Sequence, residues 1–240
     1  MKKVIIGLIS KHNNANTSRA DTFIRDEMKN AIFDNNAIAI GILPPNKDIT
    51  LVDKNNEYNI FKTLDILFSD KETQDFIAQI QLCDGIILSG GGESDAYEMW
   101  VSKYCYDNNI PILGICAGHN NLIRGIGGKT KKVSNPEFHN QPNKDYVHGI
   151  TIEKNSNFYN FVKKEKLNVN SRHKNTIECP ASLDVVAYDE DGNIEVTEAK
   201  NKICFIGMRF HPESLYMNDL IHNNIFKKFI EICKTNSKRL

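Results

Sequence analysis

The fold is decided by one stretch of sequence, Pro111-Ile112-Leu113-Gly114-Ile115-Cys116-Ala117-Gly118-His119-Asn120-Asn121-Leu122. An apolar run ends in a glycine-bracketed cysteine, and a helix-compatible segment follows. This pattern, G-x-C-x-G, is that of a nucleophile elbow on a sharp strand-to-helix turn. Glycines relieve crowding at the strained turn, and the N-terminus of the following helix favours thiolate over thiol. A buried structural cysteine is the competing interpretation of Cys116.

A second apolar run near the C-terminus delivers a histidine and a carboxylate: Cys204-Phe205-Ile206-Gly207-Met208-Arg209-Phe210-His211-Pro212-Glu213-Ser214. Pro212 biases His211 away from helical angles. In an extended segment, His211 and Glu213 share one face. A thiol, an imidazole to take its proton and a carboxylate to orient the imidazole predict a catalytic triad of Cys116, His211 and Glu213.

These motifs resemble those of the class I glutamine amidotransferase superfamily, and within it the free-standing gamma-glutamyl hydrolases, including those that act on gamma-glutamyl-gamma-aminobutyrate. Three further stretches carry the resemblance: Leu88-Ser89-Gly90-Gly91-Gly92-Glu93-Ser94-Asp95, Val147-His148-Gly149-Ile150 and Val169-Asn170-Ser171-Arg172-His173-Lys174. They occur in family order and, with the two motifs above, span most of the chain.

The resemblance also implies roles for the residues around the triad. The oxyanion hole is expected to use the backbone N–H of Ala117 and one from the glycine loop, at Gly91 or Gly92. The expected substrate-binding residues are Gly90, Asn120, Ser171, Arg172 and His173. Asn120 stands where the family usually has glutamine, so its reach is shorter. No metal and no cofactor are expected.

Short apolar runs alternate with helical spacing, which indicates βαβ units and a parallel sheet. We expect an α/β protein, a flavodoxin-like three-layer sandwich with a mostly parallel central sheet, a small antiparallel β extension in its C-terminal half, and one domain over residues 1–240. Helices are expected at 19–35, 61–80 (bent near 69–70), 94–106 and 220–233. Strands are expected at 4–9, 37–43, 85–89, 110–115, 149–153, 167–170, 183–188, 194–198 and 204–208, and a surface loop at 129–145.

Composition excludes several function classes. The 240 residues carry 30 basic and 30 acidic side chains, so no net field recruits nucleic acid or an anionic membrane. No apolar run is long enough to span a bilayer. The six cysteines show no CxxC pair, which favours reduced thiols in a cytoplasmic protein.

The expected activity is hydrolysis of the gamma-glutamyl amide bond of a small compound, through a thioester on Cys116. Two alternatives stay open. The chain could be a glutaminase subunit that supplies ammonia to a separate synthetase chain, or a non-catalytic binding protein on the same fold. A homo-oligomer is compatible with the sequence, and the amine part of the substrate is left open because loops at 46–58 and 129–146 would select it.

Overall fold

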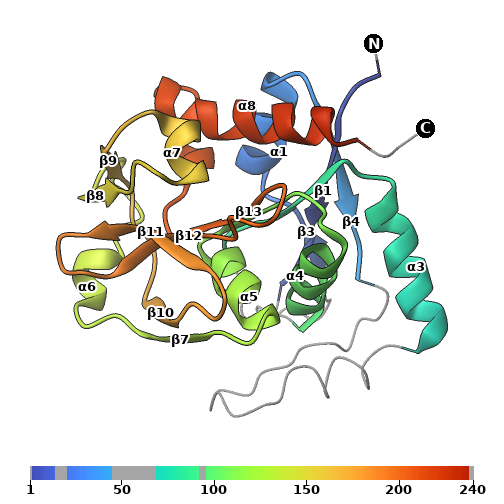
Figure 1. Cartoon of the computed structure of the whole chain (residues 1–240), viewed down its shortest axis with the longest axis horizontal. Helices are drawn as coiled ribbons and strands as arrows, with labels where there is room; N and C mark the ends of the chain where they lie inside the picture. The colour runs from blue at the N-terminus through green and yellow to red at the C-terminus, as the bar shows by residue number, and fades with distance from the viewer. Residues whose placement is uncertain (1, 14–20, 45–68, 92–95, 238–240) are drawn as a thin grey trace.

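A nine-stranded sheet forms the centre of the protein, whose computed structural model describes residues 2–13, 21–44, 69–91 and 96–237 (Figure 1). Five neighbouring strands are parallel, in the spatial order β4 (Ile38–Ile42), β1 (Ile5–Ile9), β5 (Gly85–Leu88), β6 (Ile112–Ile115) and β13 (Phe205–Met208). Antiparallel strands then extend the sheet, in the order β12 (Ile194–Glu198), β11 (Asp184–Asp189), β8 (His148–Ile152) and β9 (Lys166–Val169).

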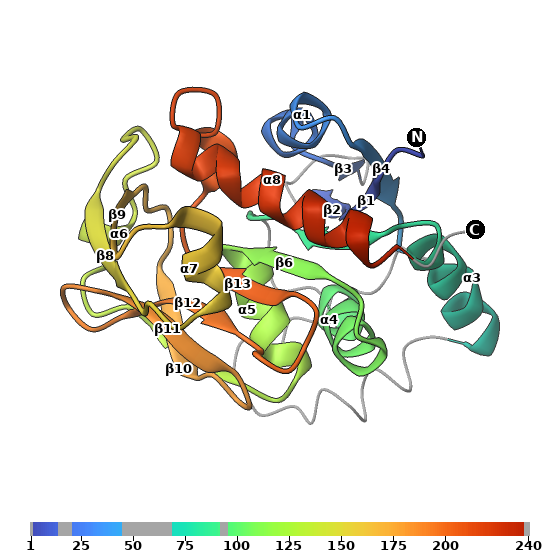
Figure 2. The ribbon, with the colours of Figure 1, turned by 45° about the horizontal axis from the view of Figure 1, so that its top comes forward.

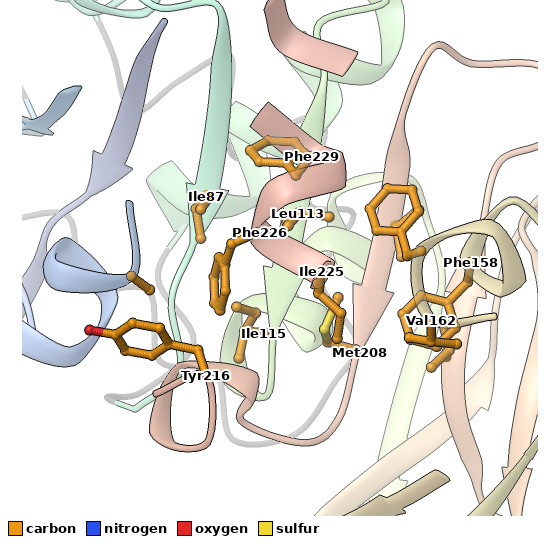
Figure 3. Packing of buried hydrophobic residues seen from close by; sticks show 14 of the residues in the cluster. Ile87, Leu113, Ile115, Phe158, Val162, Met208, Tyr216, Ile225, Phe226 and Phe229 are labelled. Carbon is orange, nitrogen blue, oxygen red and sulfur yellow. The ribbon is translucent and has the colours of Figure 1, made fainter. Parts of the chain in front are cut away.

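Helices cover both faces of the sheet. Side chains of strand β5 alternate between the two covered faces: Ile87 packs in one buried cluster, and Ile86 and Leu88 in the other. The first cluster includes residues of α1 (Asp26–Asp34), α7 (Asn157–Val162) and α8 (Leu220–Thr235), and part of it is seen in Figure 3. The second includes residues of α3 (Asp70–Gln81), α4 (Ala96–Asn108) and α5 (Ala117–Gly125). The protein is therefore a three-layer α/β sandwich, as predicted, and Figure 2 shows α8 running along one face.

The antiparallel part differs in detail from the sequence expectation. Most of its strands continue the main sheet. A separate two-stranded sheet pairs β10 (Asn175–Cys179) with β7 (Lys129–Lys132). A second small sheet pairs β2 (Lys11–Asn13) with β3 (Asp21–Phe23).

Two predicted segments were wrong in part. The helix expected at 19–35 begins only at Asp26, because residues 21–23 pair with β2 as a strand. The loop expected at 129–145 contains β7 and α6 (Pro136–His139). The Lys-rich β7 has no apolar alternation, and its backbone pairing with β10 decides its conformation. Helix α6 is short and starts from Asn135, whose side chain accepts from the N–H of Phe138.

The predicted bend near 69–70 is a helix start. Ser69 and Glu72 form a capping box at the N-terminus of α3, and the expected helical residues 61–68 lie outside the described residues. Strand β10 and helix α7 were not predicted. Within the described ranges, no helix combines the length and the apolar character needed to cross a bilayer.

The sheet brings three strand ends together. In the parallel register, Leu88 of β5 is opposite Gly114 of β6, and Ile115 of β6 is opposite Met208 of β13. The segments that leave these strands at their carboxyl ends carry Gly90, Cys116 and His211, where ligands of parallel sheets collect.

Candidate active site

Cys116 lies on the turn between β6 and α5 in a strained backbone conformation, with φ 52° and ψ −104°. Its N–H donates to the carbonyl of Met208 at 2.8 Å, which ties the turn to β13. A Cβ on Gly118 would lie 2.0 Å from the carbonyl oxygen of Leu88, and one on Gly114 would lie 2.8 Å from that of Gly118. Both glycines of the motif are therefore required by close backbone approach. Cys116 itself keeps 9% of its surface exposed.

His211 lies beside Cys116 and is bonded to Glu213. Its Nδ1 and the Oε1 of Glu213 are 2.7 Å apart, with both residues buried. The expectation of an extended 211–213 segment was wrong, because residues 212–214 form one turn of 3-10 helix that starts at Pro212. This turn directs the Glu213 carboxylate back to the imidazole.

The remaining ring nitrogen of His211 faces the sulfur. Its Nε2 has no other hydrogen-bond partner among the described residues. Burial raises the pKa of Cys116, but the charge and hydrogen bond of His211 outweigh it, and the net pKa is lowered. Burial lowers the pKa of His211, yet the charges of Glu213 and Cys116 raise it to about 10. Both shifts favour the thiolate–imidazolium form of the pair.

Asn170, directly after β9, holds the main chain of His211, whereas Glu213 holds its ring. The N–H of His211 donates to Asn170 Oδ1 at 2.7 Å, and Asn170 Nδ2 donates to the His211 carbonyl at 2.8 Å. Asn170 is fully buried. Asn170 lies in the Val169–Lys174 stretch, and its role was not predicted from the sequence.

The glycine loop after β5 borders the same space. A Cβ on Gly90 would lie 2.4 Å from Cε1 of His211 and 3.3 Å from Cβ of Cys116. Gly91 has φ +84°, and a Cβ there would lie 2.8 Å from Nη2 of Arg25. The structure places Ala117 at the first position of α5, and Gly92 lies outside the described residues. The oxyanion role of these backbone groups stays a prediction.

Arg209 is a buried cation at the site, and its role was not predicted from the sequence. It is 1% exposed and donates to the Cys116 carbonyl at 3.3 Å, to Asn120 Oδ1 and to the Asn175 carbonyl. Its charge further lowers the pKa of Cys116. The sequence signal that could have identified Arg209 is its position: it follows β13 directly and lies two residues before His211.

The other predicted substrate-binding residues are placed as follows. Ser171 Oγ donates to the His139 carbonyl at 2.7 Å, and Arg172 Nη1 donates to Ser214 Oγ at 3.0 Å. His173 is buried in a cluster with His139 and two further side chains, considered below. Burial and the charge of Arg209 lower the pKa of His173 to about 2.

His119 points away from the nucleophile. Its Nε2 lies 2.8 Å from Thr197 Oγ1 on β12, and burial holds its pKa well below the ordinary value. His119 is therefore not placed to act as the base of the predicted triad.

Comparison with known proteins places these features in a family. The Peptidase C26 family matches residues 92–213. Anthranilate synthase component 2 of Cyanophora paradoxa is 33% identical over 154 residues, covering 61% of this chain and 75% of that protein. A glutamine-hydrolyzing subunit of GMP synthase from Picrophilus torridus is 32% identical over 157 residues, covering 63% of this chain and 77% of that protein.

Two solved structures share the fold. A GMP synthase subunit from Thermoplasma acidophilum superposes with a TM-score of 0.66 at 18% identity, covering 98% of this chain and 96% of that one. The glutaminase domain of Trypanosoma brucei CTPS, with bound acivicin, superposes with a TM-score of 0.65 at 13% identity, covering 99% of this chain and 96% of that one.

Proposed function

The chain belongs to the Peptidase C26 family, and from that premise we propose that it hydrolyses the gamma-glutamyl amide bond of a small compound through a thioester on Cys116. The family makes it a cysteine hydrolase domain of the glutamine amidotransferase type. One observation supports the thioester chemistry: Cys116, His211 and Glu213 lie together within this one chain, with the pKa of the thiol lowered and the pKa of the imidazole raised.

Acylation starts from the charged pair. The thiolate of Cys116 attacks the gamma-carbonyl carbon, and the carbonyl oxygen becomes an oxyanion near the N–H groups of Ala117 and the glycine loop. Each such donor contributes about 10²–10³ in rate. The imidazolium of His211 gives its proton to the amide nitrogen, the C–N bond breaks, and an amine leaves while the thioester remains.

Deacylation uses the same groups in reverse. His211, now neutral, takes a proton from water as the water oxygen attacks the thioester carbonyl. The C–S bond breaks, glutamate leaves, and the thiolate–imidazolium pair is restored. Glu213 holds the ring in one tautomer throughout, through its bond to Nδ1.

The glutamyl end of the substrate carries an α-carboxylate and an α-ammonium group, and charged side chains border the site. Arg25 lies against Gly91. Arg172 donates to Ser214, whose hydroxyl donates to Glu27 at 3.0 Å. We assign the α-carboxylate to the arginines and the α-ammonium to Glu27.

The predicted substrate-binding residues fall into two groups. Some border the reacting atoms, and the polar atoms of the others already bond to protein groups. Gly90 borders the reacting atoms, because any larger residue would meet His211. Asn120, Ser171 and His173 bond to Arg209, His139 and Asn175 respectively. These three support the site by positioning.

A glutaminase subunit is the second candidate, and the relatives support it about as well as the hydrolase. They are named as anthranilate synthase component 2 and as a glutamine-hydrolyzing subunit of GMP synthase. Under this proposal the thioester chemistry is the same, the substrate is glutamine, and ammonia passes to a separate synthetase chain. A non-catalytic binding role has no comparable support, because binding alone does not call for the charged pair.

Turnover by the purified chain alone separates the two candidates. The panel is glutamine, gamma-glutamyl-aminobutyrate and a gamma-glutamyl polyamine, with release of glutamate as the readout and Cys116→Ala as the inactive control. Turnover of a gamma-glutamyl amide without a partner, with an acyl-enzyme seen by intact mass, supports the hydrolase. Turnover confined to glutamine, and only after a synthetase chain is added, would support the second candidate. Location in the cytoplasm stays a prediction from cysteine usage.

A further inference from the structure

Three histidines and a glutamate from distant parts of the chain meet beneath the antiparallel half of the sheet. They are His139 at the end of α6, His148 at the start of β8, His173 after β9, and Glu195 on β12. Their side chains are 1%, 5%, 2% and 1% exposed. One nitrogen from each of the three histidines lies within 4.8 Å of the others, and a second group within the same limit joins His148 to Glu195 and Asp189. The elements that carry them lie together at one end of the molecule (Figure 1).

The polar atoms that face one another in this cluster lack hydrogen-bond partners. Among the described residues, none bonds to Nε2 of His148, Nε2 of His173 or either carboxylate oxygen of Glu195. Nδ1 of His139 is also without one there. Buried polar groups are nearly always paired, and an unpaired buried carboxylate is costly. Several such atoms in one buried cluster favour a shared partner.

Backbone carbonyls orient the imidazole rings of His173 and His148 through their Nδ1 atoms. Nδ1 of His173 lies 3.1 Å from the carbonyl of Asn175, and Nδ1 of His148 lies 3.3 Å from that of Gly149. A carbonyl can only accept, so each Nδ1 carries the proton and each Nε2 presents a lone pair to the cluster. This is how ligating histidines are held, with the second nitrogen donating to a carbonyl or carboxylate.

We propose that His139, His148, His173 and Glu195 bind one divalent transition-metal ion, with Zn²⁺ the best match. Three imidazoles and one carboxylate complete a four-coordinate shell, whereas Ca²⁺ and Mg²⁺ require oxygen ligands. Glu195 Oε1 lies 3.5 Å from Nε2 of His173 and 3.9 Å from Nε2 of His148. Ligand atoms around tetrahedral zinc lie about 3.4 Å apart, so side-chain rotations have to bring His139 and Glu195, which share no group of ligand atoms within 4.8 Å, into one shell.

The site is structural, because all four ligands come from the protein and leave no open position. It connects to the nucleophile through one backbone group. The Asn175 carbonyl accepts from His173 and from Arg209, and Arg209 also donates to the Cys116 carbonyl. The ion would therefore hold His173, and through Asn175 the buried guanidinium that lies beside the thiolate.

Metal content of the whole chain tests the proposal. Protein produced with added zinc and then dialysed against metal-free buffer should retain about one zinc per chain by elemental analysis. Co²⁺ substituted for zinc should show the visible absorption of a tetrahedral nitrogen–oxygen site. Titration of metal-free protein with Zn²⁺ to 100 times Kd should raise Tm by about 5–10 °C.

Matched variants localise the ion. Glu195→Gln and His173→Ala should lose the bound zinc and the Tm rise. Glu198→Gln should keep both, since Glu198 is a buried carboxylate three residues further on β12 that bonds to the N–H groups of Asn157 and Phe158. His222→Gln should also keep them, because His222 pairs with Asp219 on α8.

Two results would overturn the proposal. One is folded wild-type protein that retains no zinc, shows no tetrahedral Co²⁺ spectrum and has an unchanged Tm. Glu195 would then be held by a proton shared with the histidines. The other is zinc retained in full by Glu195→Gln and His173→Ala, which would place the ion elsewhere. The measurements on the wild-type protein decide whether it binds zinc at all, even where a variant fails to fold.

Discussion

Asn170 holds His211 by two hydrogen bonds to the same backbone unit, one accepted from its N–H at 2.7 Å and one donated to its carbonyl at 2.8 Å. The two residues are 41 positions apart in sequence. The candidate catalytic histidine is thus fixed through its main chain by Asn170 and through its ring by Glu213.

Asn170→Ala should lower kcat about 10–100-fold with little change in KM, because a displaced imidazole loses alignment with the sulfur. Asn168→Ala is the matched control, an exposed asparagine two residues earlier on β9, and should keep wild-type rates. Steady-state kinetics with the best gamma-glutamyl amide provides the measurement. Equal kcat values for the two variants would contradict the proposed positioning role of Asn170.

The pH dependence of kcat/KM should show an alkaline limb near pH 10. The pKa of His211 is raised to about 10, so the imidazolium persists until the pH rises through that value. The acid limb reflects Cys116, whose pKa is lowered, and activity falls as the pH drops below it. In Glu213→Gln the carboxylate charge that raises the pKa of His211 is gone, so the alkaline limb should move to lower pH. An unmoved limb would contradict the assigned role of Glu213.

Gly90→Ala should reduce kcat/KM about 100-fold, because its Cβ would lie 2.4 Å from Cε1 of His211 and the ring must shift. Gly192→Ala is a useful contrast. Gly192 has φ +79° with nothing within 4 Å of the added Cβ, so the change should cost about 1 kcal/mol of stability and leave activity intact. Wild-type activity in Gly90→Ala would show that the glycine loop is not next to the reacting atoms.

Cys116 should react with a glutamine-like chloroketone ahead of the other thiols. All six cysteines are free, and burial raises the pKa of Cys105, Cys204 and Cys233. Cys179 is exposed, so Cys179→Ser serves as the control and should keep the full labelling rate. Peptide mapping by mass spectrometry reads out the site. Labelling shared evenly among the thiols would argue against a low-pKa nucleophile.

A buried ion pair supports the helix that follows the nucleophile. Lys11 lies 2.5 Å from Glu98, both side chains are at most 1% exposed, and Glu98 also accepts from Asn121 of α5. Glu98→Ala leaves a buried cation unpaired and should lower the free energy of unfolding by about 3–5 kcal/mol. Lys29→Ala, in an exposed pair with Asp26, should leave it unchanged within error. Urea unfolding measures the free energy of unfolding of both variants. Equal losses would mean that burial does not determine how much each ion pair contributes.

The sequence by itself determined the alternation of strands and helices, the elbow and the three candidate residues of the triad. Each is written in a local pattern: apolar runs of strand length, two glycines that admit close backbone approach at Cys116, and a proline after His211. Such signals depend on neighbours along the chain, so they can be read without knowing the strand order.

The tertiary structure alone decided which distant side chains meet. Asn170 reaches His211, Arg209 lies behind Cys116, and His139, His148 and His173 converge on Glu195 only because β9, β8 and β12 belong to one sheet. The Lys-rich β7 became a strand for the same reason, since β10 supplied its backbone partners. No spacing in the sequence encodes these contacts, because they follow from long-range pairing and from the need to bury polar atoms with partners.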